Sequence, residues 1–186
     1  VQTCALPISM LDMPANITVP SVPGACSKTV FWITPTAFDH CDEVGFAASH
    51  VPGTSFPLGE TTVSYTSTDS SGNSSTSSFT ITVEDLDAPI YTDTVPNIST
   101  VIDPGTCGTA VTWTEPLALD ACDAELTITS THQSGDTFEV GSTLVTYTAT
   151  DDFNNSASIF FNVVVADNEG PAIIGLPADF TVGVDR

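Results

Sequence analysis

The sequence predicts an all-β protein composed of tandem immunoglobulin-like β-sandwich domains arranged as an extended rod. Three observations support this fold class. The 186 residues are 41% hydrophobic and include 13 prolines and 12 glycines, so the chain has enough apolar surface for a core and many turn-forming residues. Apolar and polar residues alternate along several segments, which is typical of half-buried strands. Long segments also occur twice in the same order, which indicates two similar domains.

The internal repeat is clearest around the cysteines. The segment CSKTVFWITPTAFDHC, residues 26–41, returns as CGTAVTWTEPLALDAC at residues 107–122. Farther along, SFPLGETTVSYTSTDSSGN and FTITVEDLDAP return as TFEVGSTLVTYTATDDFNN and FNVVVADNEGP. These matches predict one domain over residues 9–88 and a second over residues 89–170. The segment LPADFTV then resembles MPANITV of the first copy, so residues 171–186 are expected to form the first strand of a truncated third repeat.

The segment before the first copy has no counterpart elsewhere in the chain. Its sequence, VQTCALPI, is the translation of GTTCAGACGTGTGCTCTTCCGATC, the end of a common sequencing adapter. The match extends over every codon of the segment. We therefore expect residues 1–8 to be a non-native leader, in which Cys4 needs no partner.

Period-two alternation predicts the longest strands of each copy. Val63 and Tyr65 alternate with Ser and Thr, and Phe79, Ile81 and Val83 alternate with threonines. Each of these segments is therefore expected to bury one face as an antiparallel strand. The second segment is more apolar in the second copy, where it contains IFFNVVV, which favours a strand that is covered on both faces.

Each copy also has one tryptophan in a predicted strand. Trp32 and Trp113 follow a valine at the two-residue spacing that places side chains on the same face of a strand. Several short strands in each copy, separated by turn signals, indicate the immunoglobulin-like sandwich. The copies are followed by EDLDAP and ADNEGP, where a proline fixes the backbone angle φ. A short, stiff connection of this kind predicts the extended rod.

The charge of the chain excludes several classes of partner. Lys and Arg total 2 and Asp and Glu total 23, so the formal net charge is −21. Such a surface repels the phosphates of nucleic acids and anionic lipids, and no apolar run is long enough to span a membrane. We therefore expect no nucleic-acid partner and no membrane insertion in this segment. Carboxylates suit Ca²⁺, which is a candidate ligand; the alternative is that the acidic residues only keep the surface soluble.

Taken in order, the recurring residues resemble a known family. Each copy contains C…W-x-x-P…D-x-C, then F-x-x-G-x-x-x-V-x-Y-x-x-x-D-x-x-x-N, and then F-x-x-x-V-x-D-x-x-x-P. This pattern resembles the hyalin repeat (HYR) module, and the resemblance covers residues 7–182. It implies an immunoglobulin-related fold, an extracellular or cell-surface location, and a role in adhesion or matrix rather than in catalysis.

Each copy contains two cysteines, Cys26 and Cys41 in the first and Cys107 and Cys122 in the second. In a secreted β-domain this arrangement predicts the disulfides Cys26–Cys41 and Cys107–Cys122. Closing a loop of about 15 residues contributes about 3 kcal/mol in the chain-entropy model. The alternative is zinc, which usually takes four Cys or His ligands that include a closely spaced cysteine pair. The sequence has no such pair, and the second copy has alanine in place of His40.

Acidic residues and asparagines gather at the end of each copy and at one turn within each copy. Because their oxygens could coordinate Ca²⁺ and stiffen the connection between copies, they are candidate metal ligands. These residues are Asp69, Asn73, Asp85, Asp87, Asp151, Asn155, Asp167 and Glu169. The alternative is that Asp and Asn form turns there and cap backbone groups. No other cofactor is predicted.

Certain asparagines lie in N-x-S/T sequons and are candidate glycosylation sites. They are Asn16, Asn73, Asn97 and Asn154, of which Asn16 and Asn97 occupy equivalent positions in the two copies. The alternative is that these sequons arise by chance, because Ser and Thr are abundant in the chain.

These observations predict a non-enzymatic extracellular structural and adhesive repeat protein, as a subunit or segment of an extracellular fibre. The expected partners are other copies or repeats of the protein itself and cell-surface or matrix components. No catalytic triad order, phosphate loop or paired-carboxylate motif recurs in the two copies, so no catalytic residue is predicted. The alternative is a spacer or glycan-binding module of a larger secreted enzyme, which would need a catalytic domain in the remainder of that protein. Aromatic side chains exposed on one face would favour glycan binding. Most aromatic residues instead occupy core-like strand positions.

Overall fold

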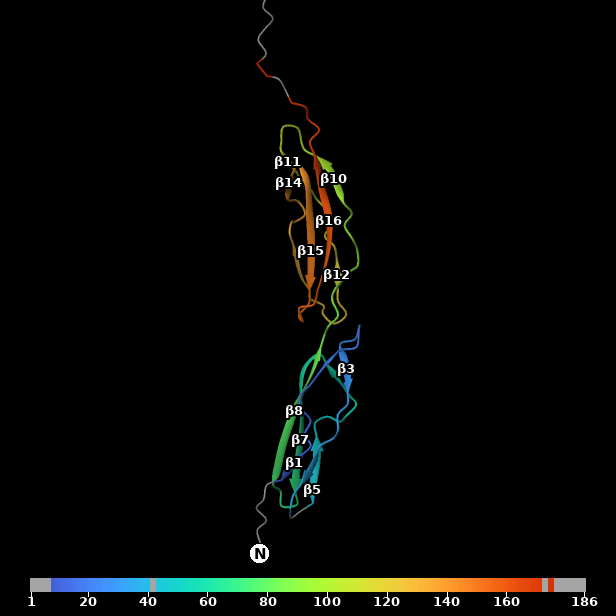
Figure 1. Ribbon diagram of the computed structural model, residues 1–186, viewed down its shortest axis with the longest axis vertical. Coiled ribbons are helices and arrows are strands. Elements are labelled where there is room, and N and C mark those ends of the chain that lie inside the picture. Colours follow the sequence, from blue (N-terminus) through green and yellow to red (C-terminus); the bar gives the residue numbers. More distant parts are fainter. Residues whose placement is uncertain (1–7, 41–42, 172–173, 176–186) are drawn as a thin grey trace, which may run out of the picture. The chain divides into compact units, whose positions relative to one another are not determined.

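The computed structural model describes residues 8–40, 43–171 and 174–175, and every regular element in these ranges is a β-strand (Figure 1). The predicted all-β class is therefore confirmed. Among the same residues, no helix reaches the length and hydrophobicity needed to cross a membrane. Residues 1–7 of the predicted leader and residues 176–186 of the predicted third repeat lie outside the described part of the chain.

The strands of the first copy form one four-stranded sheet and two shorter pairs. In chain order they are β1 (Ser9–Leu11), β2 (Ile17–Pro20), β3 (Ser27–Val30), β4 (Thr36–Phe38), β5 (Val44–Ala48), β6 (Thr54–Pro57), β7 (Gly59–Asp69) and β8 (Ser74–Glu84). The larger sheet has the order β2-β8-β7-β5, while β3 pairs with β6 and β1 pairs with β4. β7 and β8 form a long antiparallel hairpin that begins with Gly59 opposite Val83. β2 lies parallel to β8, with Ile17 opposite Ile81.

The core of the first copy lies between the four-stranded sheet and the β3–β6 pair. Its buried members come from β7 and β8 on one side and from β3 and β6 on the other: Val30, Phe56, Val63, Tyr65, Phe79, Ile81 and Val83. The β7 and β8 residues of this cluster occupy alternate positions along their strands, so the predicted period-two pattern is confirmed. Two sheets that share one core form a β-sandwich, as the sequence predicted.

The tryptophan of the first copy packs on this core from outside the strands. Trp32 lies beyond the end of β3, and its ring centroid is 6.0 Å from that of Phe56 and 5.6 Å from that of Phe79. Its Nε1 donates a hydrogen bond of 2.7 Å to the hydroxyl oxygen of Tyr65. The prediction that Trp32 and Trp113 lie in the middle of a strand is wrong, because ring packing, rather than strand pairing, holds these indoles on the core.

The second copy repeats the arrangement of the first. Its strands are β9 (Ile90–Tyr91), β10 (Ile98–Val101), β11 (Gly108–Ala110), β12 (Ala118–Leu119), β13 (Thr127–Ser130), β14 (Thr137–Glu139), β15 (Gly141–Thr150) and β16 (Ser156–Ala166). The four-stranded sheet has the order β10-β16-β15-β13, with β11 paired to β14 and β12 paired to β9. β10 lies parallel to β16, with Ile98 opposite Val163. Trp113 packs against Phe138 and Phe161, at centroid distances of 6.0 and 5.2 Å.

The apolar strand β16 is buried on one face only. Phe161, Val163 and Val165 are at most 2% exposed, whereas Phe160 is 70% exposed and Val164 is 38% exposed. The prediction that both faces of this segment are covered is therefore wrong. Only the face that carries Phe161 packs on the core, so the apolar residues of the other face reach the surface.

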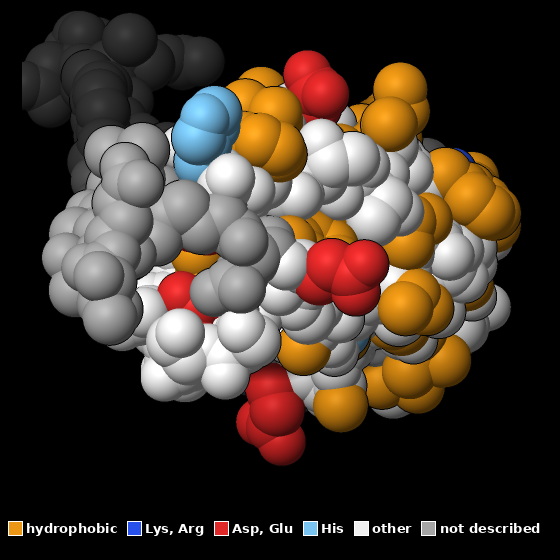
Figure 2. Space-filling view, turned by 90° about the horizontal axis from the view of Figure 1, so that it is seen from below, with side chains coloured by type: hydrophobic (Ala, Val, Ile, Leu, Met, Phe, Trp, Pro, Cys, Tyr) orange, Lys and Arg blue, Asp and Glu red, His pale blue; other side chains and the backbone are white. Residues whose placement is uncertain are grey.

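The surface mixes apolar, uncharged and acidic side chains. Figure 2 shows one face, on which acidic side chains stand at separate places among hydrophobic and uncharged ones. This distribution fits a chain with 23 acidic and 2 basic residues. Phe31 and Ile33 are among the large hydrophobic side chains that are mostly exposed, and scattered exposures of this kind are normal for protein surfaces.

Contacts between residues divide the chain into two compact units. Unit 1 comprises Val1–Thr94, Pro116–Thr129 and Tyr147–Ile159, and unit 2 comprises Val95–Glu115, Ser130–Thr146 and Phe160–Arg186. Unit 1 therefore contains segments of the second copy in addition to the whole of the first. The candidate site lies within unit 1.

Candidate functional site

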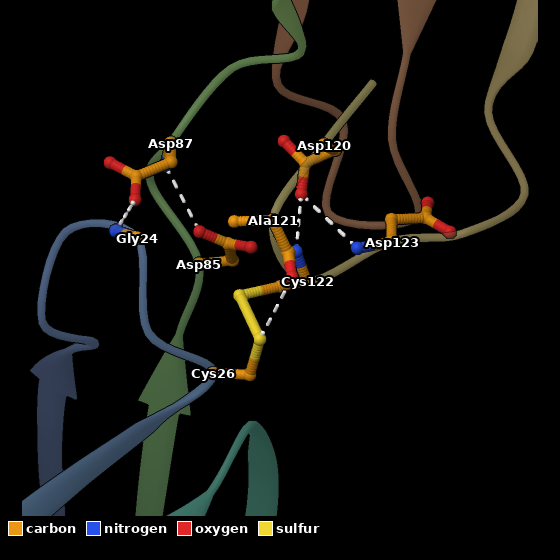
Figure 3. The surroundings of a disulfide bond; sticks show 8 residues. All are labelled: Gly24, Cys26, Asp85, Asp87, Asp120, Ala121, Cys122 and Asp123. Atoms are coloured by element: carbon orange, nitrogen blue, oxygen red, sulfur yellow. Dashed lines mark hydrogen bonds between the residues drawn. A yellow bond between two sulfur atoms is a disulfide. The ribbon is translucent and has the colours of Figure 1, made fainter.

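A disulfide bond between Cys26 and Cys122 is the centre of the candidate site (Figure 3). Their Cα atoms are 5.2 Å apart, and 96 positions separate them in the sequence. This Cα distance lies within the usual range for disulfides. Both residues belong to unit 1, although Cys26 comes from the first copy and Cys122 from the second.

A tight turn presents Cys26 in front of strand β3. Val22 and Ala25 form an isolated bridge, and Gly24 between them has a positive φ of 72°, which favours glycine. The Gly24 N–H donates a hydrogen bond of 2.6 Å to Oδ2 of Asp87. The turn is thereby held against the segment that follows β8.

The same segment also positions Cys122. Strand β12 pairs with β9, where Ala118 lies opposite Tyr91, and β9 begins shortly after Asp87. Past β12, Oδ1 of Asp120 accepts hydrogen bonds from the backbone N–H of Cys122 at 2.8 Å and from that of Asp123 at 3.1 Å. These contacts bring Cys122 to the end of β8, where the turn that carries Cys26 is also held.

The observed bond corrects the predicted cysteine pairing. The predicted disulfides Cys26–Cys41 and Cys107–Cys122 are wrong, because Cys26 is bonded to Cys122 and Cys107 is an exposed free thiol. Cys41 lies outside the described residues. The physical reason is the β9–β12 pairing, which carries Cys122 to the end of β8, where the turn that presents Cys26 is also held.

Asp85 lies beside the disulfide with one carboxylate oxygen unsatisfied. Its side chain is only 2% exposed, and its Oδ1 accepts a hydrogen bond of 3.0 Å from the backbone N–H of Asp87. Its Oδ2 has no hydrogen-bond partner among the described residues. Oxygen atoms of Asp85 and Asp120 and the sulfur of Cys122 all lie within 4.8 Å of one another (Figure 3).

Four of the eight predicted calcium ligands form turns within their own copy. Asp69 Oδ1 accepts hydrogen bonds from the N–H groups of Ser71 and Asn73, and its Oδ2 accepts one from Asn73 Nδ2. Asp151 and Asn155 repeat the same side-chain contact at 2.8 Å. In these turns the carboxylates already accept the hydrogen bonds of nearby donors, which is the alternative considered for them.

The predicted residues at the ends of the two copies also accept backbone hydrogen bonds. Asp167 Oδ1 accepts one from Glu169 N–H at 2.8 Å, and Glu169 Oε2 accepts one from Gly105 N–H at 3.0 Å. Of the predicted set, the structure brings Asp85 together with Asn155, whose Nδ2 donates to the Asp85 carbonyl oxygen at 3.0 Å. Calcium binding by the whole set stays a prediction.

The hydrogen bond from Asn73 leads to a testable prediction. This side-chain contact, above all, and the backbone N–H groups of the turn lower the pKa of Asp69 below its ordinary value. The pKa is lowered in the folded state, so the ionised carboxylate favours folding above the unfolded pKa, and this contribution is lost as the pH falls through the folded pKa. Asn73→Ala is expected to raise the pKa of Asp69, measured by NMR titration. Ser71→Ala is the control, because Ser71 donates only through its backbone; an unchanged pKa in Asn73→Ala would contradict the assignment.

The candidate glycosylation sites all lie on the surface. Asn16, Asn73, Asn97 and Asn154 are exposed. Asn16 and Asn97 accept equivalent hydrogen bonds through Oδ1, from the N–H of Thr80 and of Asn162. Their Nδ2 atoms, which would carry a glycan, make no such contact with these strands. Glycosylation stays a prediction.

Asp120 is the residue of the site that sequence reasoning missed. It stands two positions before Cys122, as Asp39 stands before Cys41. This recurring Asp-x-Cys was visible in the repeat, and it was the available signal. The pairing of β9 with β12, which brings Asp120 close to Asp85, is a long-range contact that leaves no such mark in the sequence.

Comparison with known proteins identifies both copies with one family. The model of the HYR domain matches residues 7–83 and 84–165. Hyalin of Lytechinus variegatus is 39% identical over 163 residues, which is 84% of this chain and 31% of that protein. Hyalin of Strongylocentrotus purpuratus is 37% identical over 172 residues, covering 86% of this chain and 14% of that protein. The chain thus spans less than a third of the length of these curated relatives.

A more distant likeness is found among solved structures. The protocadherin gammaB7 EC3-6 cis-dimer structure is 17% identical and covers 86% of this chain and 50% of that chain, with a TM-score of 0.40. The Drosophila N-cadherin EC1-4 structure is 14% identical and covers 86% of this chain and 49% of that chain, with a TM-score of 0.37.

Proposed function

Because the chain belongs to the HYR domain family, we propose that it is a segment of an extracellular fibre whose HYR repeats are joined to one another by disulfides. The chain is a non-enzymatic, adhesion-type repeat module, and its relationship to hyalin supports an extracellular location. The observation that carries the proposal is the Cys26–Cys122 disulfide, since Cys26 lies in the first matched repeat and Cys122 in the second.

Disulfides of this kind can link successive repeats in series. Each bond joins the first cysteine of one repeat to the second cysteine of the repeat that follows. Cys107 is the first cysteine of the second repeat, and its thiol is exposed and free. The turn before Cys107 resembles the turn before Cys26. The Gly105 N–H donates to the Glu169 carboxylate at 3.0 Å, as the Gly24 N–H donates to the Asp87 carboxylate in the first copy. Cys107 is therefore presented by the same local structure as the cysteine that is already bonded.

The partner proposed for Cys107 is a second copy of this chain. That copy offers Cys41, the second cysteine of its first repeat, in the sequence FDHCD, which corresponds to LDACD around Cys122. Bond formation removes two protons and two electrons from the two thiols. A disulfide oxidant such as oxidised glutathione takes them up and becomes two thiols. Repetition of this step produces a covalent fibre.

The proposal is tested by incubating the full chain in a buffer of oxidised and reduced glutathione. Dimers and longer oligomers are expected on a non-reducing gel and by light scattering, and a reducing agent should return them to monomers. Peptide mapping should identify Cys107 linked to Cys41. Cys107→Ser is expected to abolish the oligomers while the Cys26–Cys122 bond remains.

The matched control is Cys4→Ser, because Cys4 has no counterpart in the repeat and its removal should leave oligomer formation unchanged. Two outcomes count against the proposal. One is a wild-type chain that stays monomeric under oxidising conditions, and the other is a Cys107→Ser variant that still forms the same covalent oligomers.

A further inference from the structure

We propose that Asp85 and Asp120 bind a Ca²⁺ ion beside the Cys26–Cys122 disulfide. The first observation is the burial of Asp85, which is 2% exposed. Burying a carboxylate is unfavourable unless hydrogen bonds or opposite charge compensate it. Asp85 Oδ1 has the N–H of Asp87 as a partner, but Oδ2 has none among the described residues. One buried oxygen therefore lacks the interaction that would stabilise its charge.

The second observation is the position of the Asp120 carboxylate. Its Oδ1 accepts two backbone hydrogen bonds, which fix its orientation next to Cys122. The ligand oxygens of Asp85 and Asp120 lie within 4.8 Å of each other. Oxygens bind Ca²⁺ at about 2.3–2.6 Å, so two ligands of one ion can be up to about 5 Å apart. The two carboxylates therefore have a spacing that one ion can bridge. Figure 3 draws both of them near the disulfide.

The donor atoms select a hard cation. The sulfur of Cys122 is the third group near these carboxylates, but it is bonded to Cys26 and offers no thiolate for zinc. The remaining donors are oxygens, which Ca²⁺ prefers, and waters or backbone carbonyls can complete its coordination. The chain also has only 2 basic residues against 23 acidic ones, so a bound cation is the available means of neutralising two close carboxylates.

The second copy provides a matched comparison at Asp167. This residue is the counterpart of Asp85, and it makes the same local turn, since its Oδ1 accepts a hydrogen bond of 2.8 Å from Glu169 N–H. Asp167, however, is exposed. The local turn is thus the same in the two copies, and the difference is the burial of Asp85 beside Asp120.

The test uses the full, oxidised chain after removal of divalent cations with a chelator. Ca²⁺ is titrated by calorimetry at constant ionic strength into the wild type and into Asp85→Asn, Asp120→Asn and Asp167→Asn. We expect saturable binding to the wild type, a loss of affinity of about tenfold or more in Asp85→Asn and Asp120→Asn, and no change in Asp167→Asn. Replacing Ca²⁺ with Na⁺ at equal ionic strength should produce no binding heat.

Several outcomes would overturn the proposal. They are the absence of saturable binding to the wild type, equal affinities in all variants, and an equal loss in Asp167→Asn, which would indicate diffuse attraction to the acidic surface. Asp120 is partly exposed, and Asp120→Asn keeps the oxygen that accepts the two backbone hydrogen bonds, so this variant is expected to fold. It therefore tests whether the two carboxylates bind Ca²⁺ even if Asp85→Asn does not fold.

Discussion

Replacing Cys26 with serine is expected to lower the free energy of unfolding by about 4–5 kcal/mol. The reason is the length of chain that the Cys26–Cys122 bond closes, because 96 positions separate the two residues. In the chain-entropy model, a cross-link around a loop of about 100 residues disfavours the unfolded state by about 4.7 kcal/mol. Urea denaturation of the oxidised monomers, separated from any covalent oligomers and followed by circular dichroism, measures the difference.

Cys107→Ser is the control for this measurement. The Cys107 thiol is exposed and unbonded, so its replacement should change the free energy of unfolding by less than about 0.5 kcal/mol. The pairing that the sequence alone suggested leads to a different result. It would make Cys26→Ser and Cys107→Ser equally costly, each by about 3 kcal/mol for its own short loop. Equal losses in the two variants would therefore contradict the observed bond.

Phe161→Ala is expected to destabilise the protein by about 3–5 kcal/mol. Phe161 is 2% exposed, and its ring packs against Trp113 at a centroid distance of 5.2 Å. Truncating a buried phenylalanine removes its hydrophobic contribution and leaves a cavity, and the sum of the two effects has this magnitude. Urea denaturation followed by tryptophan fluorescence measures the loss, because Trp113 lies directly against the altered site.

The neighbouring residue offers a control with the same side chain. Phe160 precedes Phe161 on β16 but is 70% exposed. Phe160→Ala is expected to change the free energy of unfolding by no more than about 0.5 kcal/mol, as is usual for surface substitutions. A loss as large as that in Phe161→Ala would mean that the outer face of β16 is covered.

The sandwich was predictable because its signals are local and occur twice. Alternation at Val63 and Tyr65 and at Phe79 and Ile81 specifies which strand faces are buried, and the second copy repeats it. The alternation of apolar and polar residues does not show the buried face of every strand. In IFFNVVV, apolar side chains point to both faces, and only tertiary packing decides that Phe160 is left at the surface.

The site was predictable only in its parts. Both cysteines of the bond and the buried Asp85 were singled out from the sequence, but their association was not. Four cysteines allow three pairings, and sequence spacing does not choose among them. The choice depends on the pairing of β9 with β12, a contact of very short strands that have little periodicity of their own. Asp120 was missed for the same reason.

The direction of two strand pairs has a mechanical consequence. In each copy, the first strand of the four-stranded sheet in chain order runs parallel to the last strand of that sheet. These pairs are β2 with β8 and β10 with β16. When the chain before the first of these strands and the chain after the second are pulled apart, the two strands are drawn in opposite directions along the hydrogen bonds that join them. The slanted, evenly spaced hydrogen bonds of a parallel ladder then bear the load in shear, all at once, instead of opening one by one from an end. This strand order suits a protein that transmits tension.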